Sequence, residues 1–226
     1  MDCLRIAVVG AESTGKTTLA RAMAQRIGVE TGLTCTWVAE WLRDWCDAQG
    51  RTPRRDEQAA IAAQQQARID AAAAAHQVVV CDTTPLMTAV YSQFLFGDTA
   101  LLAQALQWQR GHALTLLTAL DLPWVADAHQ RDGPQVREPV DRLLRQHMMA
   151  NALPFSVIAH QGPTRLQAAV DAVTPLLRTR QAHVSGLFTR LTNPEAQASP
   201  RPWQPQCDCD SPACEHASLI RPPAPG

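Results

Sequence analysis

An eight-residue pattern near the amino terminus restricts the folds open to this chain more than any other feature. Residues 10–17 read G-A-E-S-T-G-K-T and directly follow the short apolar run 4–9. The residues after the pattern, 18–23, favour a helix. A strand, a glycine-bounded loop and a helix that begins at the lysine together make a phosphate-binding P-loop. The alternative, a glycine-rich turn without a ligand, does not explain why the strand and the helix flank the loop.

The residues of this loop have distinct expected roles. Gly10 and Gly15 let the backbone turn tightly, so that successive N–H groups point at phosphate oxygens beside the positive end of the helix dipole. Lys16, the only lysine of the chain, reaches the β- and γ-phosphates, and the Thr17 hydroxyl ligates Mg²⁺. The predicted cofactors are therefore ATP and Mg²⁺. The predicted nucleotide-binding residues of the loop are Gly10, Glu12, Ser13, Thr14, Gly15, Lys16, Thr17 and Thr18.

Composition restricts the class of protein. The chain has 226 residues, 46% of them hydrophobic, and a net charge of −1, which predicts one soluble, well-packed α/β domain with some residues to spare. The charge balance gives no reason to expect a nucleic-acid surface. No apolar run approaches the roughly 18–20 residues that span a membrane, and the first apolar run is too short for a signal peptide. We expect a cytoplasmic protein with reduced cysteines at positions 3, 35, 46 and 81.

Strand and helix patterns alternate along the chain. Strands are expected at 4–9, 35–39, 78–81, 113–119 and 155–159, and helices at 16–27, 41–48, 55–75, 85–96, 101–110, 139–151 and 164–177, with a turn at 29–33. Such alternation produces right-handed βαβ units. We predict a P-loop NTPase fold, a three-layer sandwich with a central, mostly parallel sheet.

Two regions of different composition divide the chain. Residues 1–180 hold the predicted P-loop domain. Residues 181–226 contain 8 of the 16 prolines and no periodic pattern, so we expect a disordered tail. Three thiols and an imidazole in this tail suit tetrahedral Zn²⁺, although their spacing is not that of a standard zinc motif. These residues are either a zinc site or incidental side chains: Cys207, Cys209, Cys214 and His216.

Two acidic residues follow predicted parallel strands, where ligands bind in such sheets. Asp82 ends the apolar run 78–81 and is expected to hold Mg²⁺ opposite Thr17; alternatively, it caps the next helix. Glu40 follows strand 35–39 and is expected to accept a proton from an acceptor hydroxyl. Alternatively, Glu40 only favours the dipole of the helix that it precedes. Arg43, one turn further on, is a candidate for substrate contact.

The segment between strand 113–119 and helix 139–151 is polar and contains glycine and proline. Phosphotransferases often carry a lid at this point, whose arginines neutralise charge on the transferred group. Arg131 and Arg137 are the candidates, and the alternative is a solvated polar loop. Trp124 lies next to this segment and either packs in the core, as we expect for Trp37, or contacts a base or pyridine ring.

The ordered set of motifs resembles the ribosylnicotinamide kinase domain of the bifunctional NAD-biosynthesis regulators, and the related stand-alone AAA-type ATPases. The resemblance covers about residues 4–178. It rests on the loop 10–17, on Glu40-Trp41 with Arg43, on Asp82-Thr83 with Thr88, and on Pro123-Trp124 with Asp127 and Arg131.

This resemblance implies transfer of the ATP γ-phosphate to the 5′-hydroxyl of nicotinamide riboside, which gives nicotinamide mononucleotide. The expected partner is thus a small-molecule nucleoside. The relatives carry an adenylyltransferase domain upstream and this chain shows none, so only the kinase step is expected. The implied catalytic residues are Lys16, Glu40, Asp82 and Arg131. The implied substrate-binding residues are Glu40, Arg43, Thr83, Trp124 and Asp127.

Two other functions agree with the same motifs. One is a P-loop ATPase with water as the acceptor. The other is a nucleotide-sensing module whose cysteine-containing tail recruits a partner. The sequence does not choose an oligomeric state.

Overall fold

A computed structural model of the chain describes residues 3–125 and 133–184. Its centre is a five-stranded sheet in the order β2-β3-β1-β4-β5, and every pairing between these strands is parallel. The strands are β1 (Leu4–Val9), β2 (Cys35–Val38), β3 (Val78–Asp82), β4 (Leu114–Thr118) and β5 (Phe155–Ile158). The predicted parallel α/β fold is confirmed, and the predicted strand positions agree with the observed ones to within a residue at each end.

Seven α-helices of the described residues surround the sheet. They are α1 (Lys16–Thr31), α2 (Trp41–Gln49), α3 (Gln58–Ala75), α4 (Pro85–Phe96), α5 (Leu102–Gln109), α6 (Arg137–Ala150) and α7 (Gly162–Val184), with single 3-10 turns at η1 (Arg55–Glu57) and η2 (Pro134–Val136). No helix in the described part of the chain is long and apolar enough to cross a membrane.

Two helices run further than predicted. The expected turn at 29–33 is wrong, because α1 continues to Thr31 and ends at Gly32, whose left-handed φ of 68° lets its N–H bond the Gly28 carbonyl. An ion pair of 2.7 Å between Arg26 and Glu30 supports the extra turn. Helix α7 likewise continues past the expected end to residue 184 and contains Pro175.

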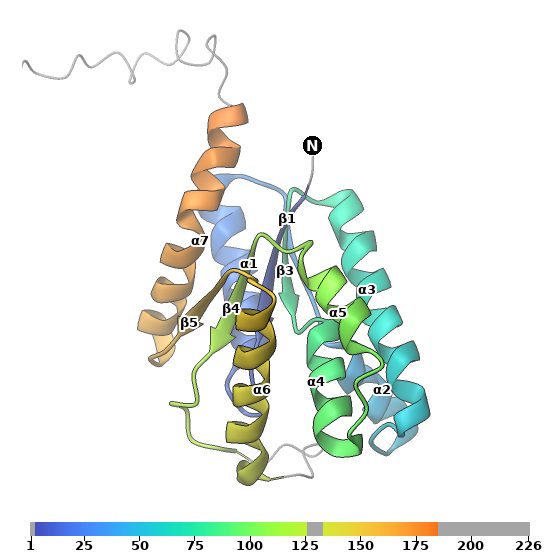
Figure 1. The fold of residues 1–226 in the computed structure, drawn as a ribbon. Helices are drawn as coiled ribbons and strands as arrows, with labels where there is room; N and C mark the ends of the chain where they lie inside the picture. Colours follow the sequence, from blue (N-terminus) through green and yellow to red (C-terminus); the bar gives the residue numbers. More distant parts are fainter. Residues whose placement is uncertain (1–2, 126–132, 185–226) are drawn as a thin grey trace, which may run out of the picture. The chain divides into compact units, whose positions relative to one another are not determined.

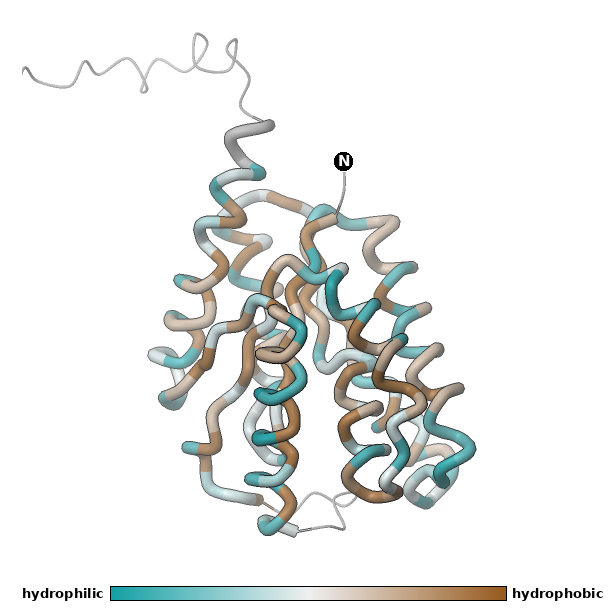
Figure 2. Tube along the Cα trace, in the orientation of Figure 1, coloured by the Kyte–Doolittle hydropathy of each residue, from teal (hydrophilic) through white to brown (hydrophobic). Residues whose placement is uncertain are grey.

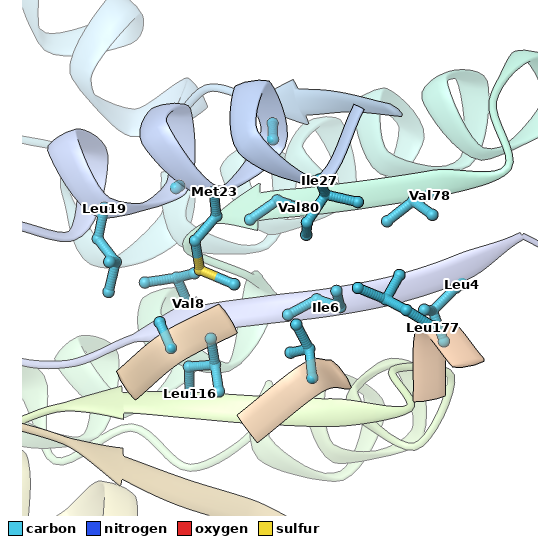
Figure 3. Close-up of a cluster of buried hydrophobic side chains, with 14 of the residues drawn as sticks. Leu4, Ile6, Val8, Leu19, Met23, Ile27, Val78, Val80, Leu116 and Leu177 are labelled. Carbon is cyan, nitrogen blue, oxygen red and sulfur yellow. The ribbon is translucent and has the colours of Figure 1, made fainter. Parts of the chain in front are cut away.

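The helices cover the sheet on both faces, as the three-layer prediction requires (Figure 1). Helices α1 and α7 pack on one face, where Met23 and Ile27 of α1 meet Ile6 and Val8 of β1 in a cluster of buried side chains (Figure 3). Helices α4 and α6 pack on the other face against alternate residues of the same strands. Figure 2 shows hydrophobic residues along the central strands and mixed residues along the surrounding helices. A sheet covered on both faces leaves its two ends as the places where polar groups can gather.

Strand β3 lies inside the sheet, and all five of its residues are buried. The prediction of a central strand for this apolar run is therefore confirmed. The strands of a parallel sheet all end on the same side, so the ends of β2, β3, β1 and β4 lie side by side along one edge of the sheet. Asp82 at the end of β3 aligns with Val8 of β1, and the loop of residues 10–15 begins two residues later.

Candidate active site

The loop between β1 and α1 packs closely against β4. Gly10 has a φ of 151°, and a Cβ atom at this position would lie 2.0 Å from Thr118 Oγ1. Ser13 and Gly15 also have positive φ angles, of 54° and 72°. A backbone that turns this sharply directs several N–H groups to one side, which makes a concave site for an anion. The geometry fits phosphate.

Two threonine hydroxyls fix the loop to the sheet. Thr14 is completely buried, and its Oγ1 lies 2.8 Å from the Ala11 carbonyl oxygen and 2.7 Å from Thr118 Oγ1. The Thr118 hydroxyl also donates to the Val9 carbonyl at 3.2 Å. The Thr14 side chain therefore contacts protein, so only its backbone is available to the predicted nucleotide.

The single lysine lies across the loop. Lys16 Nζ donates to the Ala11 carbonyl oxygen at 2.8 Å, an acceptor that carries no formal charge. A phosphate in the loop would offer charged oxygens, which are stronger acceptors for an ammonium group. The position agrees with the predicted role of Lys16.

Asp82 lies directly beside this loop and is 1% exposed. Burial raises the pKa of its carboxyl, and a hydrogen bond from Thr17 and the charges of Lys16 and Arg43 oppose that shift. Within the described residues, Asp82 Oδ1 is buried and has no hydrogen-bond partner. The alternative role as a helix cap is not seen, because Thr84 occupies the cap position of α4.

The carboxylate of Asp82 and the hydroxyl of Thr17 fit the predicted Mg²⁺. The unpartnered buried oxygen of Asp82 is the observation that favours a cation. In the described residues, no group of three or more His, Cys, Asp or Glu side chains could hold a metal ion. Such a group is not needed, because Mg²⁺ keeps several waters and binds through one or two protein ligands and substrate phosphates.

Glu40 belongs to the same cluster. It occupies the cap position of α2 and its side chain makes no capping hydrogen bond, although a negative charge at this position also favours the helix dipole. Burial raises the pKa of Glu40. The charges of Lys16 and Arg43 and a hydrogen bond from Thr83 oppose this shift, while the charge of Asp82 adds to it. Two carboxyls with raised pKa values thus lie beside two cationic side chains.

Thr83 holds a strained backbone between these groups. Its φ is 67°, which is unfavourable for a β-branched residue. The surrounding structure fixes this conformation, because the Thr83 N–H donates to the Val8 carbonyl at 3.0 Å and the residue is buried. The strained position directs the Thr83 side chain to Glu40, next to the end of β3.

Comparison with known proteins gives the family. A model described as an AAA domain matches residues 5–165. The chain belongs to the AAA domain family. No curated protein sequence matches it. Two solved structures of NadR protein, one in complex with NR and one with NAD and AMP-PNP, each have a TM-score of 0.61 and 21% identity. They cover 76% and 78% of this AAA domain chain, which spans about 50% of the NadR chains. The resemblance stated from the motifs is thereby supported.

Two kinases share the fold over their whole length. Thymidylate kinase from Ehrlichia chaffeensis has a TM-score of 0.55 and 14% identity, and covers 78% of this AAA domain chain and 100% of its own. Deoxyadenosine kinase from M. mycoides has a TM-score of 0.52 and 11% identity, with 76% and 100% covered. At these identities the likeness shows the fold alone: this AAA domain has the fold of P-loop kinases.

The segment after β4 approaches the other side of the P-loop. The Ser13 hydroxyl accepts from the Val125 N–H at 2.9 Å, and Arg137 donates to the Leu122 carbonyl at 2.9 Å. Arg137 is buried and is the first residue of α6, so it does not belong to a solvated loop. Trp124 is half-buried, with an indole N–H that has no partner among the described residues. Two further predicted site residues, Asp127 and Arg131, and the four tail residues proposed for zinc lie outside the described ranges.

Sequence reasoning missed three residues of this region in the AAA domain. Thr118 lies 2.0 Å from the place of a Cβ at position 10, and Asp121 and Arg165 connect the ends of β4 and β5 to the P-loop. Asp121 could have been found, because it follows a predicted strand at the same edge as Asp82. Arg165 offers no sequence signal, since it stands 151 positions from its partner Thr14.

Proposed function

We propose that this AAA domain is an ATP-dependent small-molecule kinase that phosphorylates nicotinamide riboside to nicotinamide mononucleotide. The observation that carries the proposal is the cluster beside the P-loop, where Glu40 and Asp82 lie near Lys16 and Arg43. A second, partly buried carboxyl of raised pKa, on the side of the loop away from β4, suits proton removal from an acceptor hydroxyl.

Each residue of the site has a separate proposed role in phosphoryl transfer. The loop N–H groups and Lys16 bind and orient the phosphates. Thr17 and Asp82 would hold Mg²⁺, which neutralises charge on the phosphates when bound. Glu40 accepts the proton of the acceptor hydroxyl, since its raised pKa makes it a stronger base than an exposed glutamate. Arg131 is proposed to neutralise the transferred group, and Arg137 to position that segment.

The choice of nicotinamide riboside rests on the motif resemblance and on the shared fold. One NadR protein structure is a complex with NR and the other with NAD and AMP-PNP, which supports a nucleoside of this class as the acceptor. Arg43, Thr83 and Trp124 are the described residues proposed to contact it, together with Asp127. Other nucleosides are alternatives that the same assay can test.

The test is ADP release from the purified chain with Mg-ATP, with and without nicotinamide riboside. The proposal expects turnover that depends on the riboside. Replacement Lys16→Ala is expected to reduce turnover at least about a hundredfold, while Lys16→Arg keeps the charge and tests the need for a compact ammonium. Equal turnover without the riboside would exclude this acceptor in favour of an ATPase. Binding of ATP without any turnover would favour the sensor function, and a chain that ends at residue 184 would then test the tail.

A further inference from the structure

One buried arginine connects the P-loop to the ends of two strands. Arg165 lies in the first turn of α7 and is 5% exposed. Its Nη2 donates to the Thr14 carbonyl at 2.8 Å, and its Nη1 donates to the His160 carbonyl at 2.8 Å and to Asp121 Oδ1 at 3.0 Å. The other oxygen of Asp121 accepts from the His160 N–H. The planar guanidinium thus holds three acceptors from three separate segments.

The bond to Thr14 fixes the direction of one peptide group of the P-loop. In a trans peptide the C=O and the following N–H point in opposite directions. Because Arg165 holds the Thr14 carbonyl on the side of α7, the N–H of Gly15 faces away from α7. Gly15 has a φ of 72°, and glycine can change φ and ψ at little cost. Without a restraint, this peptide group could rotate and present its carbonyl to the phosphates.

The restraint acts from two sides. The Thr14 side chain is bound to Ala11 and Thr118, and the Thr14 carbonyl is bound to Arg165. The hydrogen bonds of the side chain therefore fix residue 14. The hydrogen bond to the Thr14 carbonyl fixes the peptide group between Thr14 and Gly15. Among the hydrogen bonds of the described residues, only the one from Arg165 reaches the Thr14 carbonyl.

Stability alone does not explain a buried arginine at this place. The Asp121 side chain of this ion pair is 34% exposed, and partly exposed ion pairs add little to stability. Arginine stays charged when buried and offers a rigid fork of donors, which fixes acceptors in space better than lysine does. What Arg165 provides is the relative placement of the loop and the segments after β4 and β5.

We infer that Arg165 is a positioning residue that keeps the Gly15 N–H directed at the phosphates of the bound nucleotide. This inference rests on the proposed nucleotide binding. It predicts that Arg165 affects the affinity for the diphosphate and triphosphate nucleotides, although the hydrogen bonds of Nη1 and Nη2 go to protein atoms and not to the ligand.

The test is calorimetric titration of the full chain with Mg-ADP and Mg-ATP. Arg165→Met keeps most of the side-chain volume and removes all three hydrogen bonds. We expect Kd to increase about tenfold or more, because the variant loses the hydrogen bond from the charged guanidinium that fixes the Thr14 carbonyl. A tenfold change in Kd corresponds to about 1.4 kcal/mol of binding free energy. The stoichiometry should stay at that of the wild type. Arg165→Lys should recover part of the affinity. Arg178→Met, at an exposed position of the same helix, is the matched control and should bind like the wild type.

The outcomes separate this inference from its alternatives. A purely structural role would lower the melting temperature and the binding-competent fraction but leave Kd unchanged, and that result overturns the inference. If Arg165→Met does not fold, Asp121→Asn decides: it loosens the same guanidinium, so a Kd increased a few-fold supports the inference and an unchanged Kd overturns it. Wild type that binds ADP but does not phosphorylate nicotinamide riboside contradicts only the proposed acceptor. Wild type that binds neither nucleotide overturns both proposals.

Discussion

Asp82 and Asp121 stand on opposite sides of the P-loop and differ in their electrostatic surroundings. Burial raises the pKa of Asp82 above its ordinary value, and one of its oxygens has no hydrogen-bond partner among the described residues. For Asp121, burial raises the pKa, but the hydrogen bonds from Arg165 and from backbone N–H groups and the charge of Arg165 together lower it more, so this carboxyl has a pKa below its ordinary value. The first aspartate is incompletely satisfied by the protein, and the second is satisfied.

The difference extends to the neighbours of each residue. On the side of β2 and β3, the carboxyls of Glu40 and Asp82 lie near each other and near Lys16 and Arg43, in an arrangement that a metal ion and a substrate could complete. On the side of β4 and β5, charged and polar groups bind one another and the backbone. We interpret the first side as the reactive part of the site and the second as its support.

Loss of the Asp82 charge should have the largest effect on activity. We expect Asp82→Asn to reduce kcat by about a hundredfold or more, because the predicted Mg²⁺ loses its anionic ligand. Asp121→Asn should change kcat far less and act mainly through nucleotide affinity. Steady-state kinetics of both variants at saturating Mg-ATP measure this. Equal kcat losses in the two variants would remove the proposed division between the two sides.

The same two variants should change stability in opposite directions. The raised pKa of folded Asp82 means that its ionisation costs stability as the pH rises above about 4, so Asp82→Asn should melt higher than the wild type at pH 8, by about 2–4 °C for each kcal/mol. The lowered pKa of folded Asp121 means that it stabilises above pH 4 and loses this contribution in acid. Asp121→Asn should therefore melt lower at pH 7, with a deficit that shrinks below pH 4. Melting curves of the ligand-free proteins at pH 8, at pH 7 and below pH 4 show whether each variant melts higher or lower than the wild type.

Replacement of Glu40 should sharpen the definition of the reactive side. We expect Glu40→Gln to lower kcat by about a hundredfold, with little change in the Kd of Mg-ADP, because a general base acts on the acceptor and not on the nucleotide. Since the pKa of Glu40 is raised, wild-type activity should increase with pH above the ordinary glutamate value of about 4.3. This increase should be lost in the variant. An unchanged pH profile in Glu40→Gln would assign the base to another group.

A close contact on the supporting side should limit position 10 to glycine. Gly10→Ala would place its Cβ 2.0 Å from Thr118 Oγ1, so we expect a loss of about 1–3 kcal/mol in the free energy of unfolding. Gly97→Ala is the control, since Gly97 also has a positive φ, of 65°, but nothing within 4 Å of the added Cβ. Denaturant titration compares the two. A similar cost at both positions would mean that backbone strain, and not the contact with β4, determines glycine at position 10.

The smallest effect is expected from the hydroxyl that joins the loop to β4. Thr118→Val keeps the shape and removes the bonds to Thr14 and to the Val9 carbonyl. We expect a cost of about 1 kcal/mol in stability and a modest loss of ADP affinity. Thr118→Ser, which keeps the hydroxyl, should stay near the wild type. If Thr118→Val binds ADP unchanged, the supporting side does not transmit its geometry to the phosphate site through this contact.

Much of the architecture follows from local sequence patterns. The apolar run 78–81 predicted a buried central strand, and every residue of β3 is buried. The glycine-bounded loop predicted the turn between β1 and α1, since few other sequences permit such a turn. The end of α1 was not predicted, because residues 29–31 show no strong helix signal and only Gly32 provides the observed stop. The roles of the predicted site residues remain predictions that the variants above test.

What the sequence by itself determined is the P-loop, the parallel sheet and the two acids that follow its strands. Each of these depends on residues that are neighbours in the chain or on a rule about where strands end. The tertiary structure alone decided that Thr14 faces the protein, that Thr118 approaches Gly10, and that Arg165 holds the loop from 151 positions away. It also decided which acid is satisfied, because burial and hydrogen bonding set a pKa, and both arise from packing between distant segments.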